Sequence, residues 1–189
     1  MCIRDRPPIA AVSEQGIEFA GRSADDKRHQ IGDVLLELGI DATVLTAPDS
    51  IAWLLNIRGG DVPRTPLPLS FAVLHSDGTV DLFIDERKLV TDVKSAFGEE
   101  VRRHRPDRLL EVLQDLGAQE LHVQLCSRTC ADWFRTVLED SGATVKRGPD
   151  PCVAFKARKN EVELEGMRAA HRRDGAALTS FLCWLDTHA

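Results

Sequence analysis

The pattern of apolar and polar positions first becomes regular between Ser23 and Gly39. Ser23 is a favourable N-cap, Asp25 and Asp26 suit the positive end of a helix dipole, and Gly39 is a typical helix stop. Between them, apolar residues recur at the spacing of one helix face: Ile31, Val34, Leu35 and Leu38. The pattern predicts a helix that packs one face against a sheet.

The stretch from Asp41 to Pro66 has a different pattern. The apolar run 42–47 predicts a buried strand, and Pro-Asp-Ser at 48–50 predicts the capped start of a short helix. A loop rich in Gly, Pro and charge follows. A strand that leads into a capped helix and such a loop places polar side chains at the rim of a sheet, where binding sites commonly lie. The candidates are Trp53, Arg58, Asp61 and Arg64.

Two further apolar segments, 68–75 and 79–85, read as strands joined by the turn-forming dipeptide Asp77-Gly78. Both faces of this hairpin are apolar, so we expect it to lie inside a sheet that is covered on both sides. A two-residue loop would place Phe71 and Val73 on one face with Leu82 and Ile84, and Ala72 and Leu74 on the other face with Phe83.

The rest of the chain alternates helical and extended patterns, which predicts an α/β fold. Strands are expected at 101–103, 121–125 and 144–146. Helices are expected at 86–97, at 107–116, and from a cap at Ser127 to Gly142, the last burying Trp133, Phe134, Val137 and Leu138. A flavodoxin-like parallel sheet would fit this alternation nearly as well, except for the Asp77-Gly78 hairpin.

Two segments suggest boundaries in the chain. Residues 7–22 read as a linker, and Arg147–Pro151 contains two prolines and a glycine that continue neither regular structure. From Asn160, with Glu163 three residues later, we expect a capped helix. Its long apolar stripe has little in this chain to cover it: Leu164, Met167, His171, Leu178, Phe181, Leu182 and Leu185. We therefore expect a main domain over 23–150 and the start of a truncated second domain over 151–189.

Composition excludes several classes of protein. A net charge of −6 argues against a nucleic-acid partner, and the basic run 102–105 reads as a solvated strand end. Five cysteines without a zinc-ligand spacing indicate reduced thiols in a cytoplasmic protein. No stretch approaches the roughly 18 apolar residues of a membrane span. Met1–Arg6 reads as the translation of a sequencing adapter, and we exclude it from the fold.

Several runs of residues carry a resemblance to a known family. Ser50–Pro63, Pro66–Ala72 and Leu82–Asp85 resemble the non-catalytic middle domain of three-domain Xaa-Pro aminopeptidases, although the family more usually has Ser at the position of Gly60. Further on, 156–161 and 165–185 resemble the start of the family's pita-bread catalytic domain. The resemblance covers nearly the whole chain from about Phe19 onward.

The resemblance implies a fold and an activity. The fold is the ribonuclease-H-like creatinase N-terminal type, with a mixed sheet of about six strands. The family hydrolyses the bond between an N-terminal residue and a following proline, using two divalent metal ions, usually manganese, held by two Asp, one His and two Glu. Those ligands lie in the catalytic domain, so the resemblance implies that this fragment is inactive and binds no metal. It also implies a peptide substrate and a homodimer.

Each candidate residue has a structural and a functional interpretation. Asp49 or Ser50 would cap a helix, and Asp61 would pair with Arg58 or with loop amides. Trp53 fills a core or domain interface, or forms a substrate platform. We expect Arg58 to help shape a substrate channel. His171 is either a packed, hydrogen-bonded histidine or a catalytic one, and we favour the former.

Two other functions stay open from the sequence alone. One is a creatinase or prolidase relative that acts on another substrate. The other is a non-catalytic protein-binding module, as some pita-bread relatives become after losing their metal ligands. We find no catalytic residue and no metal ligand set in this sequence.

Overall fold

The structure is a computed structural model and describes residues 7–90 and 97–188. The strands are β1 (Val12–Glu14), β2 (Ala42–Leu45), β3 (Ile57–Gly59), β4 (Phe71–His75), β5 (Val80–Phe83), β6 (Val101–His104), β7 (His122–Leu125) and β8 (Thr144–Arg147). The helices are α1 (Ile17–Ala20), α2 (Ala24–Glu37), α3 (Pro48–Leu54), α5 (Leu109–Ala118), α6 (Asp132–Asp140), α7 (Cys152–Ala157) and α8 (Glu161–His188), with the 3-10 turns η1 (Glu86–Lys88) and η2 (Pro106–Arg108).

Six strands form one mixed sheet in the order β6-β5-β4-β2-β7-β8. Strand β4 is antiparallel to both of its neighbours, and the other adjoining pairs are parallel. The strands β1 and β3 form a separate antiparallel pair. The expected α/β fold with a mixed sheet of about six strands is therefore confirmed.

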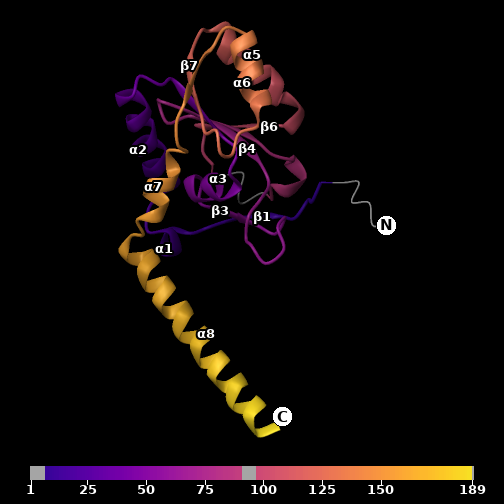
Figure 1. Ribbon diagram of the computed structural model, residues 1–189, viewed down its shortest axis with the longest axis vertical. Helices are drawn as coiled ribbons and strands as arrows, with labels where there is room; N and C mark the ends of the chain where they lie inside the picture. The colour runs from indigo at the N-terminus through magenta and orange to yellow at the C-terminus, as the bar shows by residue number, and fades with distance from the viewer. Residues whose placement is uncertain (1–6, 91–96, 189) are drawn as a thin grey trace.

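Helices cover both faces of the sheet, which gives the molecule two apolar cores (Figure 1). In the first core, α2 and α3 pack against one face, with Ile31, Leu35, Ile51, Leu54, Leu74 and Leu82 at its centre. In the second core, α5 and α6 pack against the other face, with Val73, Phe83, Leu113, Phe134 and Leu138 at its centre. Burial on both faces explains why the strands β2, β4 and β5 read as nearly continuous apolar runs.

The hairpin is present, but its expected register was wrong by one residue. The turn has three residues instead of two: His75 N–H donates to the Thr79 carbonyl at 2.9 Å, and Gly78 N–H donates to the His75 carbonyl at 3.0 Å. Gly78 has a φ of 86°, which glycine adopts without strain. Phe71 therefore faces Phe83, and Ala72 faces Leu82. Because strand side chains alternate, this single extra residue exchanges the faces of β5 relative to β4.

The segment 7–22, which we expected to be a linker, contains regular structure. Strand β1 pairs with β3, and Val12 is buried in the first core. Helix α1 follows and lies against the first turns of α8. Because the segment is short and its apolar residues follow no regular spacing, its sequence does not predict these elements. Met1–Arg6 lies outside the described residues.

Of two helix predictions between β5 and β8, one falls largely outside the described residues and the other needs correction. Of the helix expected at 86–97, the structure describes only η1, because 91–96 lie outside the described residues. Helix α6 begins at Asp132, with Ala131 as its N-cap, so the cap at Ser127 was wrong. Trp133 was expected to be buried, yet it is 46% exposed and packs edge-on against Phe134.

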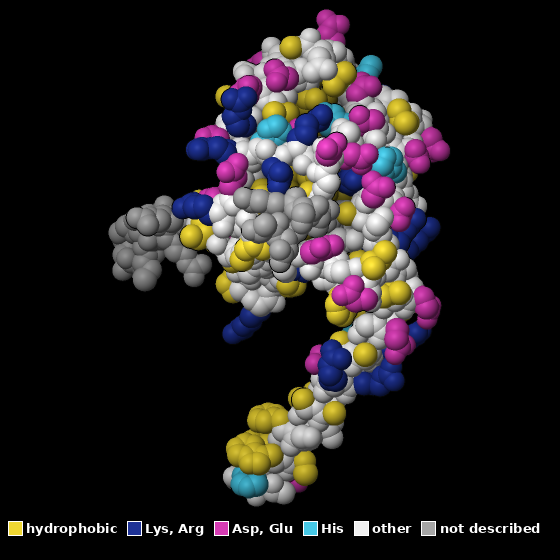
Figure 2. Space-filling model, turned by 180° about the vertical axis from the view of Figure 1, so that it is seen from behind, with side chains coloured by type: hydrophobic (Ala, Val, Ile, Leu, Met, Phe, Trp, Pro, Cys, Tyr) yellow, Lys and Arg dark blue, Asp and Glu magenta, His cyan; other side chains and the backbone are white. Residues whose placement is uncertain are grey.

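The capped helix expected from Asn160 is confirmed as α8. The Asn160 side chain accepts a hydrogen bond from Glu163 N–H at 3.0 Å, and Glu163 accepts one from Asn160 N–H at 2.9 Å. These two bonds are a capping box. Most of α8 extends away from the sheet (Figure 1), and apolar side chains gather at its far end (Figure 2), where Trp184 is 54% exposed.

Candidate functional site

The candidate site is built on α3, which begins directly after β2. Ala47 is the N-cap and Pro48 is the first helical residue, so the cap expected from Asp49 or Ser50 was wrong. The Asp49 carboxylate instead accepts a hydrogen bond from Lys156 of α7, and the same ammonium group lies 3.2 Å from the Ser50 hydroxyl. Burial would raise the pKa of Asp49, but the bond from Lys156 outweighs this effect and lowers it. These contacts fix α7 against α3.

Trp53 is half-buried at the surface of α3, beside a buried lysine. The Lys27 ammonium lies 4.7 Å from the centre of the indole ring, a cation–π contact. It also donates to the Trp53 carbonyl at 3.1 Å and to Asn56 Oδ1 at 2.6 Å. Lys27 is 2% exposed, and burial lowers its pKa to about 8. Trp53 therefore shields a charged group that has been taken almost completely out of water.

Arg58, on β3, is half-buried next to Trp53. Its guanidinium donates to the backbone carbonyls of Ala52 and Ile57, at 3.3 and 2.8 Å. Burial lowers the pKa of Arg58, and the nearby carboxylate of Glu163 opposes this effect. The ion pair that we considered between Arg58 and Asp61 is not formed.

Asp61 lies away from Trp53 and Arg58 and holds the loop after β3. Its buried carboxylate lies 2.6 Å from the Lys88 ammonium and accepts hydrogen bonds from Ala10 N–H at 3.1 Å and Leu69 N–H at 2.7 Å. The expected role as an acceptor for loop amides is therefore confirmed. Arg64, in the same loop, is exposed with a positive φ of 63°.

A groove of about 830 Å³ brings Trp53 and Arg58 together with the first turns of α8. One wall comes from α1, α3 and the loop at 66–67, and the other comes from α7 and α8, which lie close to α1 in Figure 1. Lys27 and Glu163 also line this groove, whereas Asp61 and Arg64 do not. Of the sequence-predicted candidates, the structure thus brings two into one site and leaves two outside it.

Sequence reasoning missed Lys27, and it assigned Glu163 only a capping role. Lys27 precedes Ile31 by four residues and Leu35 by eight, so it lies on the buried face of α2. A lysine at that position of an apolar face was a usable signal. The approach of Glu163 to the groove depends on how α8 meets α1, which no local pattern predicts.

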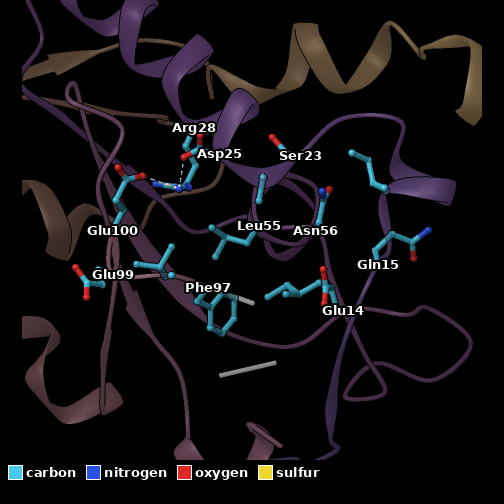
Figure 3. Close-up of a pocket in the computed structure, with 15 residues that line it drawn as sticks. Glu14, Gln15, Ser23, Asp25, Arg28, Leu55, Asn56, Phe97, Glu99 and Glu100 are labelled. Carbon is cyan, nitrogen blue, oxygen red and sulfur yellow. Dashed lines mark hydrogen bonds and ion pairs between the residues drawn. The ribbon is translucent and has the colours of Figure 1, made fainter. Parts of the chain in front are cut away.

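A second hollow, of about 410 Å³, lies between the start of α2 and residues 97–101 (Figure 3). Leu55 and Phe97 form its apolar part. Arg28 bonds across it, from one guanidinium nitrogen, to Asp25 at 2.9 Å and to Glu100 at 2.8 Å. Neither Trp53 nor Arg58 lines this hollow, so we place the candidate site in the groove.

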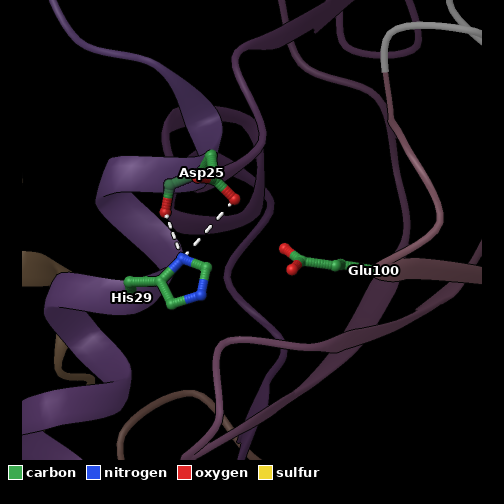
Figure 4. Close-up of side chains that lie close together, drawn as sticks. All are labelled: Asp25, His29 and Glu100. Atoms are coloured by element: carbon green, nitrogen blue, oxygen red, sulfur yellow. Dashed lines mark hydrogen bonds and ion pairs between the residues drawn. The ribbon is translucent and has the colours of Figure 1, made fainter.

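We tested whether the described residues fit the dinuclear metal site of the resembled family. Only one group of at least three metal-ligating side chains has all its ligand atoms within 4.8 Å of one another in residues 7–90 and 97–188: Asp25, His29 and Glu100 (Figure 4). All three are exposed, and the guanidinium of Arg28 already supplies positive charge to both carboxylates. This group does not fit a site of two Asp, one His and two Glu.

The remaining candidates, His171, Cys126 and Cys130, do not line the groove. His171 is exposed on α8, so its expected packing was wrong, but its expected hydrogen bond is present, because its Nδ1 lies 2.8 Å from the Met167 carbonyl. Cys126 and Cys130 are free thiols joined only through a backbone hydrogen bond of 2.9 Å. Within the described ranges, no helix is both long enough and apolar enough to span a membrane.

The family model described as "Creatinase/Prolidase N-terminal domain" matches residues 4–163. The "Probable Xaa-Pro aminopeptidase P" of Paracoccidioides brasiliensis (strain Pb03) is 35% identical over 195 residues, which cover 97% of this chain and 32% of the fungal protein. The protein of the same name from Coccidioides posadasii (strain RMSCC 757 / Silveira) is 36% identical over 191 residues, covering 96% of this chain and 31% of that protein.

Two solved structures share the fold. The X-prolyl aminopeptidase of Caenorhabditis elegans, described as a cytosolic enzyme with a di-nuclear active site, aligns with a TM-score of 0.88 at 30% identity. The alignment covers 97% of this chain and 31% of that one. The Xaa-Pro dipeptidase of Bacillus anthracis aligns with a TM-score of 0.64 at 16% identity, covering 86% and 44%, which shows the fold alone. The chain spans about a third of the length of the curated relatives it matches.

Proposed function

Because the chain belongs to the creatinase/prolidase N-terminal domain family, we propose that it is the non-catalytic lobe of a metal-dependent Xaa-Pro aminopeptidase. The relatives that match nearly all of it are named for the hydrolysis of peptides with proline at the second position. The lobe corresponds to 23–150, and 151–189 begin a catalytic domain. This lobe supplies no chemistry of its own.

In this proposal the groove beside α8 faces the substrate channel, or the interface with the catalytic domain. The observation that carries it is Arg58, a half-buried guanidinium that, among the described residues, bonds to backbone carbonyls and forms no ion pair, and that lines a groove whose other wall includes α8. A buried cation without a carboxylate partner is costly unless a second group approaches it. Trp53 gives the same groove an aromatic wall.

The catalytic metals would be held elsewhere in the longer enzyme. We propose two divalent ions, of which manganese is our expectation, and the di-nuclear active site described for the nematode relative supports their number. The Asp25, His29 and Glu100 group does not fit them, so we derive no reaction step from this chain. A homodimer and a cytoplasmic location are further parts of the proposal. The resemblance supports the homodimer, and the cytosolic nematode enzyme supports the location.

The test is hydrolysis of Ala-Pro-Phe with added Mn²⁺, measured for the longest gene product that contains this sequence and, in parallel, for the 189-residue chain. We expect release of alanine by the former and none by the latter. Hydrolysis of only the dipeptide Ala-Pro would favour a prolidase relative. Folded full-length protein without any peptidase activity would favour a protein-binding module.

A further inference from the structure

We propose that the groove between Trp53, Arg58 and the first turns of α8 binds the free C-terminal carboxylate of a short peptide. The choice of a peptide as the ligand rests on the proposed function. The choice of a carboxylate rests on the charges of the groove instead. The groove would then distinguish short peptide acids from longer or C-terminally blocked chains.

The positive and negative charges in the groove do not balance. Neither Lys27 nor Arg58 forms an ion pair with a carboxylate of the described residues; both bind carbonyl or amide oxygens. Lys27 has a pKa of about 8, so its ammonium is charged at pH 7. Glu163 is the one carboxylate that raises the pKa of both cations. Two positive charges therefore face one negative charge, and a single added carboxylate balances the site.

The other charged side chains of the groove do not supply that carboxylate. Asp49 is engaged by Lys156, and Glu165 is engaged by Arg168 and Arg172. Glu163 itself accepts the Asn160 N–H in the capping box, which holds its carboxylate at the start of α8. The charged side chains of the lobe and α8 that line the groove thus leave both cations without an ion pair; because Lys27 is only 2% exposed, the half-buried guanidinium of Arg58 is the group left for a third partner. The remaining pair, Glu18 and Lys159, is exposed and opposite in sign.

The size and the lining of the groove also suit a small ligand. A volume of about 830 Å³ lies within the range of small-molecule sites, about 300 to 1,000 Å³. Apolar side chains line the groove around the two cations: Phe19, Trp53, Leu67, Val162 and Met167. An apolar groove with a few convergent charges suits a ligand that combines an apolar side chain with one anionic end. The C-terminal residue of a short peptide has this chemistry, and a guanidinium is the cation best suited to a carboxylate.

The test is a fluorescence titration at pH 7 of the 189-residue chain with Trp133→Phe and Trp184→Phe, which leaves Trp53 as the reporter. The probes are Ala-Pro-Phe as the free acid and as the C-terminal amide. We expect the acid to bind at least tenfold more tightly than the amide. Arg58→Gln should abolish this preference, Arg58→Lys should keep part of it, and Arg128→Gln, an exposed control outside the groove, should keep all of it.

Each other outcome overturns the inference. Equal affinity for acid and amide, or no binding of either, would exclude carboxylate recognition in this groove. Tight binding of the amide Ala-Pro-Glu-NH₂ would assign the site to acidic side chains instead of C-termini. Far-UV circular dichroism confirms that each variant is folded. Because no hydrolysis is measured, a negative result here leaves the peptidase test of the longer protein unaffected.

Discussion

At the scale of single residues, the molecule keeps two lysines buried by different means. Lys88 is neutralised by Asp61 at 2.6 Å, and both side chains are almost fully inaccessible to water. Lys27 forms no ion pair with a carboxylate of residues 7–90 or 97–188, and it is held by an amide oxygen, a carbonyl and the face of Trp53. The Lys88–Asp61 pair fixes a loop, whereas the contacts of Lys27 hold a positive charge beside the groove.

The Asp61–Lys88 pair should be essential for the loop after β3. Asp61→Ala leaves the Lys88 ammonium buried without its counter-ion and removes the acceptor for two backbone amides. We expect a loss of about 3 to 5 kcal/mol in the free energy of unfolding. Urea denaturation measures this loss. The control Asp107→Asn disturbs only an exposed pair with Arg105 and should leave the curve nearly unchanged, whereas a similar loss in both variants would refute the role of burial.

Lys27 should make stability depend on pH on the alkaline side. Its pKa is lowered by burial from 10.5 to about 8, so between these values the unfolded chain binds more protons than the folded one. Stability therefore rises as the pH increases from about 8 to 10.5. In Lys27→Met this rise should disappear. Urea titrations of both proteins across this range measure it, and parallel profiles would show that Lys27 is not desolvated.

The local sequence predicted which residues are candidates for the site better than it predicted which residues they contact. Trp53 and Arg58 were found because a strand, a short helix and a Gly/Pro loop follow one another within one stretch. The partner of Asp61 was not found, because Lys88 is 27 residues away and meets it only after the sheet has formed. Lys27 was missed because charged residues are usually assigned to the exposed face of a helix.

At the scale of elements, the edge of the sheet formed by β5 and β6 is tied together by one carboxylate. Asp81 on β5 is bonded by His75 of β4 at 2.7 Å, by Arg102 of β6 at 2.8 Å and by His104 of β6 at 2.6 Å. The basic run at 102–105, expected to be solvated, therefore contributes two residues to this network. His104 also stacks on Phe83, with ring centres 5.1 Å apart. Three neighbouring strands are thereby locked in register.

Asp81 should account for part of the acid sensitivity of the protein. Burial alone would raise its pKa, but the bonds from His75, Arg102 and His104 outweigh burial and hold the pKa well below 3.8. This stabilisation is present above pH 3.8 and is lost as the pH falls towards the lowered pKa. Asp81→Asn should lose about 1 to 3 kcal/mol at pH 7 and less at pH 2. Thermal unfolding at both pH values measures this, and an equal loss at both would contradict it.

The junction between the lobe and α8 depends on Gly21. This residue has a φ of 66°, and an added Cβ would lie 2.4 Å from Asn160 Oδ1, the atom that caps α8. Asn160 also donates from Nδ2 to the Ala20 carbonyl at 2.8 Å. Gly21→Ala should therefore loosen the start of α8 at a cost of about 1 to 2 kcal/mol.

The matched control for this junction is Gly175→Ala, in an open part of α8. It should leave the junction intact and favour the helix by up to about 1 kcal/mol. Amide hydrogen exchange of residues 161–166 measures both effects. Faster exchange in Gly21→Ala and unchanged or slower exchange in Gly175→Ala is the expected result. Equal exchange in the two variants would show that Gly21 does not position α8.

At the scale of the whole molecule, the order of the elements along the chain was largely predictable, and their fine pairing was not. Apolar periodicity predicted α2, β2, β4, β5 and α8, because each carries an apolar face, although that of α8 is exposed. The register of β4 and β5 depended on one turn residue. The pairing of β1 with β3 depended on a contact between segments about 45 residues apart, and neither element has a distinctive pattern.

The groove is a feature of the whole molecule, because its walls come from segments far apart in the chain, residues 15–67 and 156–169. Lys27, Trp53 and Arg58 come from the lobe, and Glu163 comes from the helix that leaves it. Its position next to α8 is the basis for placing it between the lobe and a catalytic domain. The claim that the lobe helps to shape a substrate channel depends on this position.

The most direct test of that claim is kcat/KM for Ala-Pro-Phe in the longer gene product with Mn²⁺, compared between the unchanged enzyme, Arg58→Gln and the exposed control Arg128→Gln. We predict a loss of about tenfold or more for Arg58→Gln, equivalent to about 1.4 kcal/mol of transition-state stabilisation, and no loss for Arg128→Gln. Equal kcat/KM in all three folded enzymes would contradict the account, because the groove would then not contact the substrate.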